Sequence, residues 1–142
     1  MQVFSGLEQI RRCPEMYFPG GVTSNSICSS LLDDCLSLGA THLRMDCLDR
    51  WYVVSADVDW LRLPVNRAIP LERLFGGMYP HPTRINGVRS EAFVGAFAEA
   101  AYAATPKETR LVVGDLILPD AVSNSLCPAQ CVRSVAFVLR SG

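Results

Sequence analysis

Hydrophobic and polar residues follow a helical period in the first part of this chain. Leu7 and Ile10 recur at helical spacing near the N-terminus. The helix that they predict must end near Arg12, because Pro14 pushes the residue before it out of the α region. Residues 16–18, Met-Tyr-Phe, then form an apolar plug that needs a core to pack against.

A second amphipathic helix is predicted from Ser24 to about Leu38. Ser24 is a suitable N-cap, and Gly39 is placed to end the helix. Apolar and polar positions separate at the helical period, so one face should be buried. The apolar stripe is Ile27, Cys28, Leu31, Leu32, Cys35 and Leu38, and the polar positions are Ser26, Ser29, Ser30, Asp33, Asp34 and Ser37.

The remaining pattern predicts strands, loops and one long helix. Alternating β-rich runs indicate a hairpin, and proline and glycine pairs mark the loops. The features in chain order are strands 41–47 and 51–55, a loop over 56–70, a helical turn at 71–75, a loop with Pro80, Pro82, Asn86 and Gly87, a helix capped by Ser90 and reaching about Ala104, and strands 110–118 and 132–139.

This order of elements favours an α+β fold. We expect one domain over residues 1–142, with an open mixed or antiparallel sheet that carries helices on one face. A chain of 142 residues is long enough to bury a core of its own.

Composition narrows the classes of partner. Charged residues are 19% of the chain and the net charge is -1, so no electrostatic argument favours binding to nucleic acid or to an anionic membrane.

The apolar runs are too short to span a bilayer, and Ser5, Gly6 and Glu8 stand where a secretory signal needs apolar residues. The sequence therefore predicts a cytoplasmic protein.

The chain carries six cysteines. A disulfide framework is typical of smaller secreted domains, so we interpret most of these cysteines as reduced, buried, small hydrophobic residues. Cys127 and Cys131 are separated by three residues, and a zinc site would need His42 or His81 to converge on them. A redox or metal role for these two cysteines is left open, and no cofactor is expected.

Two stretches resemble the ATPase domain of DNA gyrase B and topoisomerase IV. Residues 6–18, GLEQIRRCPEMYF, are similar to the N-terminal segment of that family, where a Gly-Leu-Glu helix leads into Arg-x-x-Pro-x-Met-Tyr. Residues 74–79, LFGGMY, look like the family's Leu-His-Ala-Gly-Gly-Lys-Phe. The resemblance implies the GHKL (Bergerat) nucleotide-binding fold, which gyrase B shares with Hsp90 and histidine kinases.

The same resemblance shows that the ATP-handling residues are replaced. When Asp33 and Asp34 are aligned with the family's acidic pair, Ser26 stands at the general-base glutamate and Ser30 at the Mg²⁺-binding asparagine. The other register puts Ser30 at the base position. Neither restores the glutamate, and a serine cannot act as a general base unless another base activates it.

Two glycine motifs of the family are also lost. Residues 55–59 stand at its Asp-x-Gly-x-Gly motif, with Asp57 and Asp59 replacing both glycines. We interpret these aspartates as solvated loop carboxylates, with an acidic cation or partner site as the alternative. Residues 86–93 stand at the phosphate loop but keep one glycine, although Arg89 could still hold an anion.

These replacements indicate a catalytically inactive pseudo-ATPase that acts by binding a protein, as a regulator, an immunity-type protein or an assembly subunit. Trp60 and Tyr79 are the expected aromatic anchors, unless they pack in the core. Homodimerisation is left open.

The alternative function is a nucleotide-binding protein or weak ATPase with a site rebuilt from Asp33, Asp34, Asp57 and Asp59. The predicted partner-binding residues are Ser30, Asp34, Asp57, Asp59, Trp60 and Tyr79.

Overall fold

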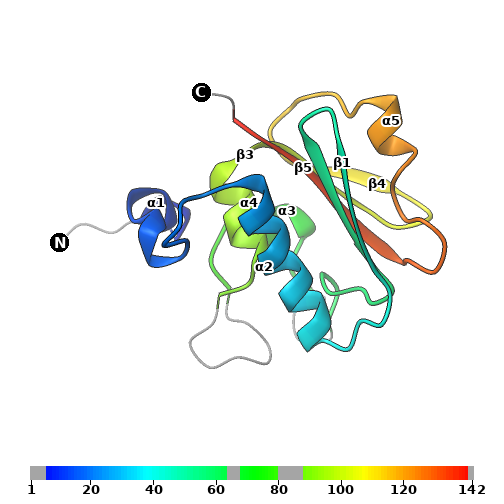
Figure 1. Cartoon of the computed structure of the whole chain (residues 1–142), viewed down its shortest axis with the longest axis horizontal. Helices are drawn as coiled ribbons and strands as arrows, with labels where there is room; N and C mark the ends of the chain where they lie inside the picture. The colour runs from blue at the N-terminus through cyan, green and yellow to red at the C-terminus, as the bar shows by residue number, and fades with distance from the viewer. Residues whose placement is uncertain (1–5, 64–67, 80–87, 141–142) are drawn as a thin grey trace.

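An open antiparallel sheet forms the centre of the protein, and helices pack on both of its faces (Figure 1). The computed structural model describes residues 6–63, 68–79 and 88–140. Within them the sheet has five strands in the order β1-β2-β5-β3-β4. The elements are α1 (Gly6–Arg12), the 3-10 helix η1 (Pro14–Met16), α2 (Ser24–Ser37), β1 (Leu43–Leu48), β2 (Trp51–Ala56), α3 (Leu71–Phe75), α4 (Glu91–Phe97), β3 (Ala98–Ala104), β4 (Thr109–Val113), α5 (Asp120–Ser123) and β5 (Arg133–Leu139). The predicted α+β class is confirmed, with an antiparallel sheet.

The sheet is apolar on both faces, which the sequence prediction missed. Side chains of one face, such as Val54 and Phe137, join the main core under α1 to α4. Side chains of the other face, such as Val53 and Val138, form a smaller cluster with Val122 of α5. Figure 1 shows α1 to α4 on one side of the sheet and α5 on the other. The expectation of helices on one face alone is therefore wrong.

The N-terminal segment folds largely as predicted. Helix α1 ends at Arg12, before the proline, and buries Leu7 and Ile10. The apolar plug divides, because Phe18 packs edge-on against Phe93 with 4.8 Å between ring centroids, whereas Met16 is exposed. Only part of the predicted plug therefore enters the core.

Helix α2 confirms the second amphipathic helix, with two corrections. Its N-cap is Thr23 rather than Ser24: the Ser26 N–H donates to Thr23 Oγ1 at 3.0 Å, and the Thr23 N–H donates to Ser26 Oγ at 2.9 Å. This reciprocal pair is a capping box. The second correction is Asp34, which is buried although it lies off the apolar stripe.

The predicted hairpin is confirmed as β1 and β2. Leu48 pairs with Trp51 across a two-residue turn. Both turn residues, Asp49 and Arg50, have positive φ values, of 50° and 73°. Two successive residues of this kind form a type I′ turn, whose twist matches that of the flanking strands.

The long helix expected from Ser90 to Ala104 is wrong. Helix α4 ends at Phe97, and the next residue begins strand β3 between β5 and β4. Alanine favours helices when a segment is isolated, but tertiary pairing overrides that weak preference. The alanines of β3 are small enough to be buried on both faces of the sheet. Ser90 also makes no side-chain cap bond to α4.

The C-terminal strands are confirmed in part. Strand β5 matches the prediction for 132–139, and helix α3 matches the turn at 71–75. Strand β4 ends at Val113 rather than residue 118, because Gly114 follows with a φ of 70°. The predicted loop with Pro80, Pro82, Asn86 and Gly87 lies outside the described residues.

Candidate functional site

A buried polar network joins α2 to the start of α4. The Ser90 N–H donates to Asp34 Oδ2 at 2.9 Å, and the hydroxyls of Ser30 and Ser90 are hydrogen-bonded at 2.5 Å. Two predicted partner-binding residues, Ser30 and Asp34, thus hold the chain where α4 begins. The sequence analysis treated Ser90 as a helix cap and not as a partner of Asp34. Its place within the proposed phosphate loop was the one signal for this contact in the sequence.

Arg89 and Glu91 form a buried ion pair beside this network. Arg89 Nη2 donates to Glu91 Oε1 at 2.7 Å and to the Trp60 carbonyl at 2.6 Å. The two side chains are only 6% and 1% exposed. Burial raises the pKa of Glu91 above its usual range, and the attraction of Arg89 opposes that rise. Because its donors are used inside the protein, Arg89 is not placed to hold a phosphate.

The two aspartates after β2 are bound to neighbouring residues rather than simply solvated. Arg133, which is buried, makes a bidentate pair with Asp59 at 2.8 and 2.9 Å. Asp57 accepts bonds from the N–H and hydroxyl of Thr41, and His42 Nδ1 lies 3.3 Å from Oδ2. The Thr41 hydroxyl bond is the main reason that the pKa of Asp57 lies well below its usual range. Both carboxylates stay partly exposed, as expected of loop residues, but each also links its loop to another segment through these bonds.

The two aromatic anchors occupy different positions. Trp60 is 1% exposed and belongs to the main core, so it does not reach a partner surface in this conformation. Its indole Nε1–H is buried and has no hydrogen-bond acceptor among the described residues. Tyr79 is half-buried against the same core, and its carbonyl accepts a bond from the Arg89 N–H at 3.1 Å. Only Tyr79 of this pair keeps an accessible side chain.

The four aspartates that the alternative function would need for a rebuilt nucleotide site do not form one cluster in the structure. Asp34, Asp57 and Asp59 each bond a different partner, and Asp33 is exposed. Among residues 6–63, 68–79 and 88–140, no three His, Cys, Asp or Glu side chains are grouped to hold a metal ion.

The six cysteines are free thiols. Cys28, Cys35 and Cys131 are buried, Cys13 and Cys127 are partly exposed, and Cys47 is exposed. The expectation that most of the six are buried therefore holds for three of them. The Cys127 Sγ lies 3.6 Å from the Ala104 carbonyl, and burial raises the pKa of both Cys127 and Cys131. These two thiols are therefore mainly protonated near neutral pH.

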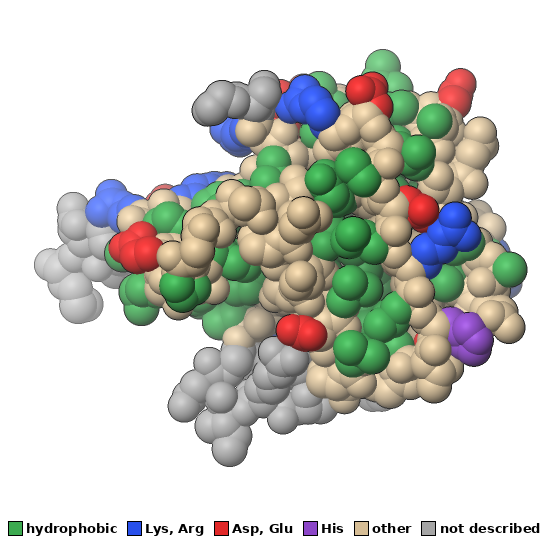
Figure 2. All heavy atoms as spheres, viewed as in Figure 1, with side chains coloured by type: hydrophobic (Ala, Val, Ile, Leu, Met, Phe, Trp, Pro, Cys, Tyr) green, Lys and Arg blue, Asp and Glu red, His purple; other side chains and the backbone are tan. Residues whose placement is uncertain are grey.

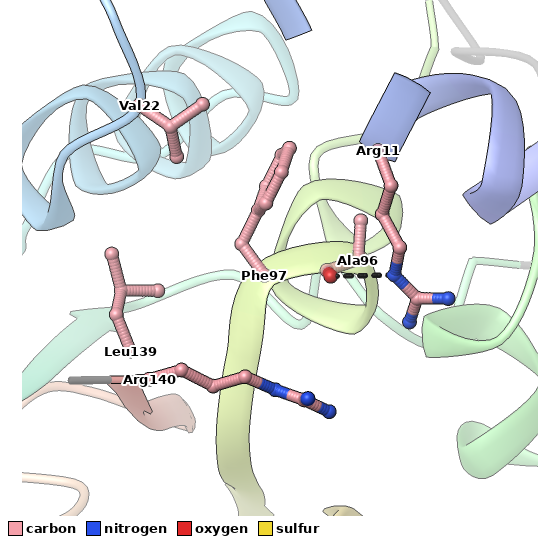
Figure 3. A pocket seen from close by; sticks show the side chains of 6 residues that line it. All are labelled: Arg11, Val22, Ala96, Phe97, Leu139 and Arg140. Carbon is pink, nitrogen blue, oxygen red and sulfur yellow. Dashed lines mark hydrogen bonds between the residues drawn. The ribbon is translucent and has the colours of Figure 1, made fainter. Parts of the chain in front are cut away.

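An open cleft of about 510 Å³ lies between α1, α4 and the end of β5 (Figure 3). Arg11 Nε donates to the Ala96 carbonyl at 2.8 Å, and Nη2 donates to the Gly95 carbonyl at 3.2 Å. Arg11 therefore satisfies carbonyls at the C-terminal end of α4. Figure 3 shows Arg140 extending past Phe97 toward the same side as Arg11. The cleft is lined by Arg11, Val22, Ala96, Phe97, Leu139 and Arg140.

A second groove, of about 320 Å³, follows the outer strand β1 where it meets α2. Its walls carry exposed apolar side chains, with Leu36 54% and Met45 45% accessible to solvent. Figure 2 shows a band of hydrophobic side chains on this face, where α2 lies beside the β1–β2 hairpin. We call it the α2–β1 groove. It is lined by Ser29, Leu32, Asp33, Leu36, Leu43, Arg44 and Met45.

Comparisons with protein-family models, curated proteins and solved structures gave no match to this chain. The resemblance to the gyrase B ATPase domain therefore stays a hypothesis carried by residues 6–18 and 74–79. Within the described part of the chain, no helix is both long and apolar enough to cross a membrane.

Proposed function

We propose that this chain is a protein-binding module without ATPase activity, and that partners bind in the α2–β1 groove. The observation that carries the proposal is the contrast between two regions. Polar groups that the gyrase resemblance assigns to a nucleotide are bonded to other groups of the same chain. The apolar side chains of Leu36 and Met45 face solvent at a strand edge.

Binding a triphosphate at the former site would break internal bonds. Arg89 would have to leave Glu91 and the Trp60 carbonyl, and losing one partner of a buried ion pair costs about 3–5 kcal/mol. Asp34 would place a further negative charge beside the phosphates. These costs favour a role in which the polar network stabilises the fold.

In the α2–β1 groove, binding a partner would form new bonds without breaking internal ones. An outer strand presents unpaired N–H and C=O groups, and proteins use such edges to bind an added strand. Apolar side chains beside the edge supply the area that backbone bonding alone lacks. A partner with an extended apolar segment would cover Leu36 and Met45 while completing the hydrogen bonds of β1.

Site-specific photo-crosslinking in cells tests this assignment. A photoreactive amino acid at Met45 should give a discrete protein adduct, and the same probe at exposed Lys107 in the β3–β4 turn should not. Leu36→Lys on the opposite wall should abolish the adduct. Equal labelling from both positions, or an adduct that Leu36→Lys leaves intact, contradicts the assignment.

Calorimetric titration with Mg-ATP tests the absence of ATPase chemistry. We expect no magnesium-dependent heat at micromolar nucleotide. Saturable binding that depends on magnesium and disappears in Asp34→Asn would instead support the alternative of a rebuilt nucleotide site.

A further inference from the structure

We infer that the partner in the α2–β1 groove is a second copy of this chain, with the two β1 strands pairing antiparallel about a two-fold axis at Met45. This inference rests on the function proposed for the groove and adds the identity of the occupant. It joins two five-stranded sheets into one continuous sheet.

The backbone of β1 determines which groups face outward. A two-residue turn makes Leu48 and Trp51 a hydrogen-bonded pair, and such pairs alternate along an antiparallel ladder. The Asp57 N–H donates to the His42 carbonyl, which fits the same alternation. Arg44 and Asp46 therefore bond to β2. The N–H and C=O groups of Leu43, Met45 and Cys47 point away from the sheet and lack strand partners among the described residues.

The side chains of these outward-bonding residues face α2. Met45 pairs with Val54 and Leu43 pairs with Ala56, and both partners belong to the main core beneath the helices. Arg44 and Asp46 lie on the opposite face of the strand, where they form an exposed ion pair at 3.0 Å. A strand added beside β1 therefore meets an apolar row on one face and a charged row on the other.

Among two-fold axes at Arg44, Met45 and Asp46, charge favours the axis at Met45. With the axis at Met45, Arg44 of each copy stands opposite Asp46 of the other. An axis at Arg44 places two arginines opposite each other, and an axis at Asp46 places two aspartates there. Like charges directly opposite destabilise a strand pair, whereas opposite charges stabilise it. The sequence of β1 is thus complementary to itself when it is centred on Met45.

Apolar contacts follow from the same register. The two Met45 side chains meet at the axis, and Leu43 of each copy stands opposite the partner's Cys47. Leu36 on the groove wall then lies beside the added strand. The exposed apolar side chains of the groove, Leu36 and Met45, thus become part of the interface.

Sedimentation velocity on the purified full chain tests the pairing. The wild type should dimerise at micromolar concentration. Met45→Lys should be monomeric, because two ammonium groups would meet at the axis. Leu111→Lys is the matched control on the other outer strand, β4, where Leu111 is 38% exposed, and it should dimerise like the wild type. Circular dichroism melting of each variant checks that it is folded.

A charge exchange tests the register. Arg44→Glu and Asp46→Arg should each weaken self-association by roughly tenfold, because each creates two like-charged pairs across the axis. The double variant should restore wild-type affinity. Without the Met45 register this rescue is not expected, since axes at position 44 or 46 would still oppose like charges.

Three outcomes overturn the inference. One is a dimer that Met45→Lys leaves intact, and another is a double variant as weak as either single variant. The third is a wild type that stays monomeric at high micromolar concentration. A monomer whose Met45 probe still gives a Leu36-dependent adduct in cells rejects the second copy but leaves the proposed function standing. A monomer without any adduct rejects both.

Discussion

Asp34 connects α2 to the start of α4 through its carboxylate. Its Oδ2 accepts the Ser90 N–H at the start of α4, and the residue is 4% exposed. Asp33, the neighbouring residue of α2, is exposed. Two adjacent residues of the same type therefore have different environments, which makes them a matched pair for measurement.

Asp34→Ala should lower the free energy of unfolding by about 1–3 kcal/mol, because it leaves a buried N–H without an acceptor. Asp33→Ala should stay within about 0.5 kcal/mol of the wild type, as surface substitutions usually do. Urea denaturation followed by tryptophan fluorescence measures both. Similar losses in the two variants would show that Asp34 does not hold α4.

The buried thiols make the free energy of unfolding decrease as pH rises in the alkaline range. Burial, with a smaller contribution from Cys47, raises the pKa of Cys28 to about 12, and burial also raises the pKa of Cys35. In the unfolded chain both titrate near 8.5. The folded state thus binds these protons more tightly, so the stabilisation is complete below about pH 8.5 and decreases as pH rises above it.

The expected loss is roughly 1.4 kcal/mol per pH unit for each buried thiol above that pH. Urea unfolding between pH 7 and pH 10 gives the slope, and Cys35→Ala should reduce it by the contribution of one thiol. Cys47→Ala, at an exposed position, is the control and should leave the slope nearly unchanged. A slope that Cys35→Ala does not alter would contradict a protonated buried thiol.

Sequence analysis identified several of the site residues but not their contacts. Ser30, Asp34 and Asp59 were predicted to bind a protein partner, and all three are used in bonds within the chain. Helical periodicity shows which face of α2 is polar, but it cannot show that Ser90 lies against that face. Burial of a polar residue depends on a contact from a distant segment, and the local pattern does not contain it.

Gly95 determines how closely α4 approaches α3. A Cβ built on this residue would lie 1.6 Å from the Phe75 carbonyl oxygen, a separation that no side chain tolerates. Gly20 lies in the turn before α2, has no atom within 4 Å of the same position and does not have a positive φ. Helix propensity and packing make opposite predictions for the helical glycine, so the direction of the effect is informative.

Gly95→Ala should destabilise the protein by about 1–3 kcal/mol or more, because the two helices must move apart. Propensity alone would give a gain of up to about 1 kcal/mol. Gly20→Ala should change stability by less than about 0.5 kcal/mol. Thermal melting of both variants distinguishes these cases, and an unchanged or raised melting temperature for Gly95→Ala would exclude the close approach.

Elements with a strong local period were predicted, and elements set by distant pairing were not. Helix α2 and the β1–β2 hairpin carry clear helical and alternating patterns, and both are confirmed. Strand β3 was assigned to a helix because its alanine-rich sequence favours helices locally. Its pairing with β5 joins residues thirty or more positions apart. It also pairs with β4 on its other side, and these two pairings make the segment extended. The short helix α5 covers a second apolar face that the pattern did not reveal.

At the scale of the whole molecule, β5 is the element on which both layers depend. It pairs with β2 on one side and β3 on the other, and its side chains reach both hydrophobic clusters. All of its residues except the last are buried. Opening β5 therefore requires disruption of the sheet centre and of both apolar layers, which amounts to global unfolding.

Amide hydrogen exchange tests this hierarchy. The N–H groups of Val135, Ala136 and Phe137 should exchange most slowly, with a free energy of opening that equals the global value from urea denaturation. In a monomer, the outward Met45 N–H should exchange much faster than the Asp46 N–H, which bonds to β2. Raising the protein concentration should then slow the exchange of the Met45 N–H selectively, because the second copy covers it. If β5 opens at a lower free energy than β1, the sheet is not the cooperative centre of the fold. If the Met45 N–H is protected at every dilution, it has a hydrogen-bond partner within the chain.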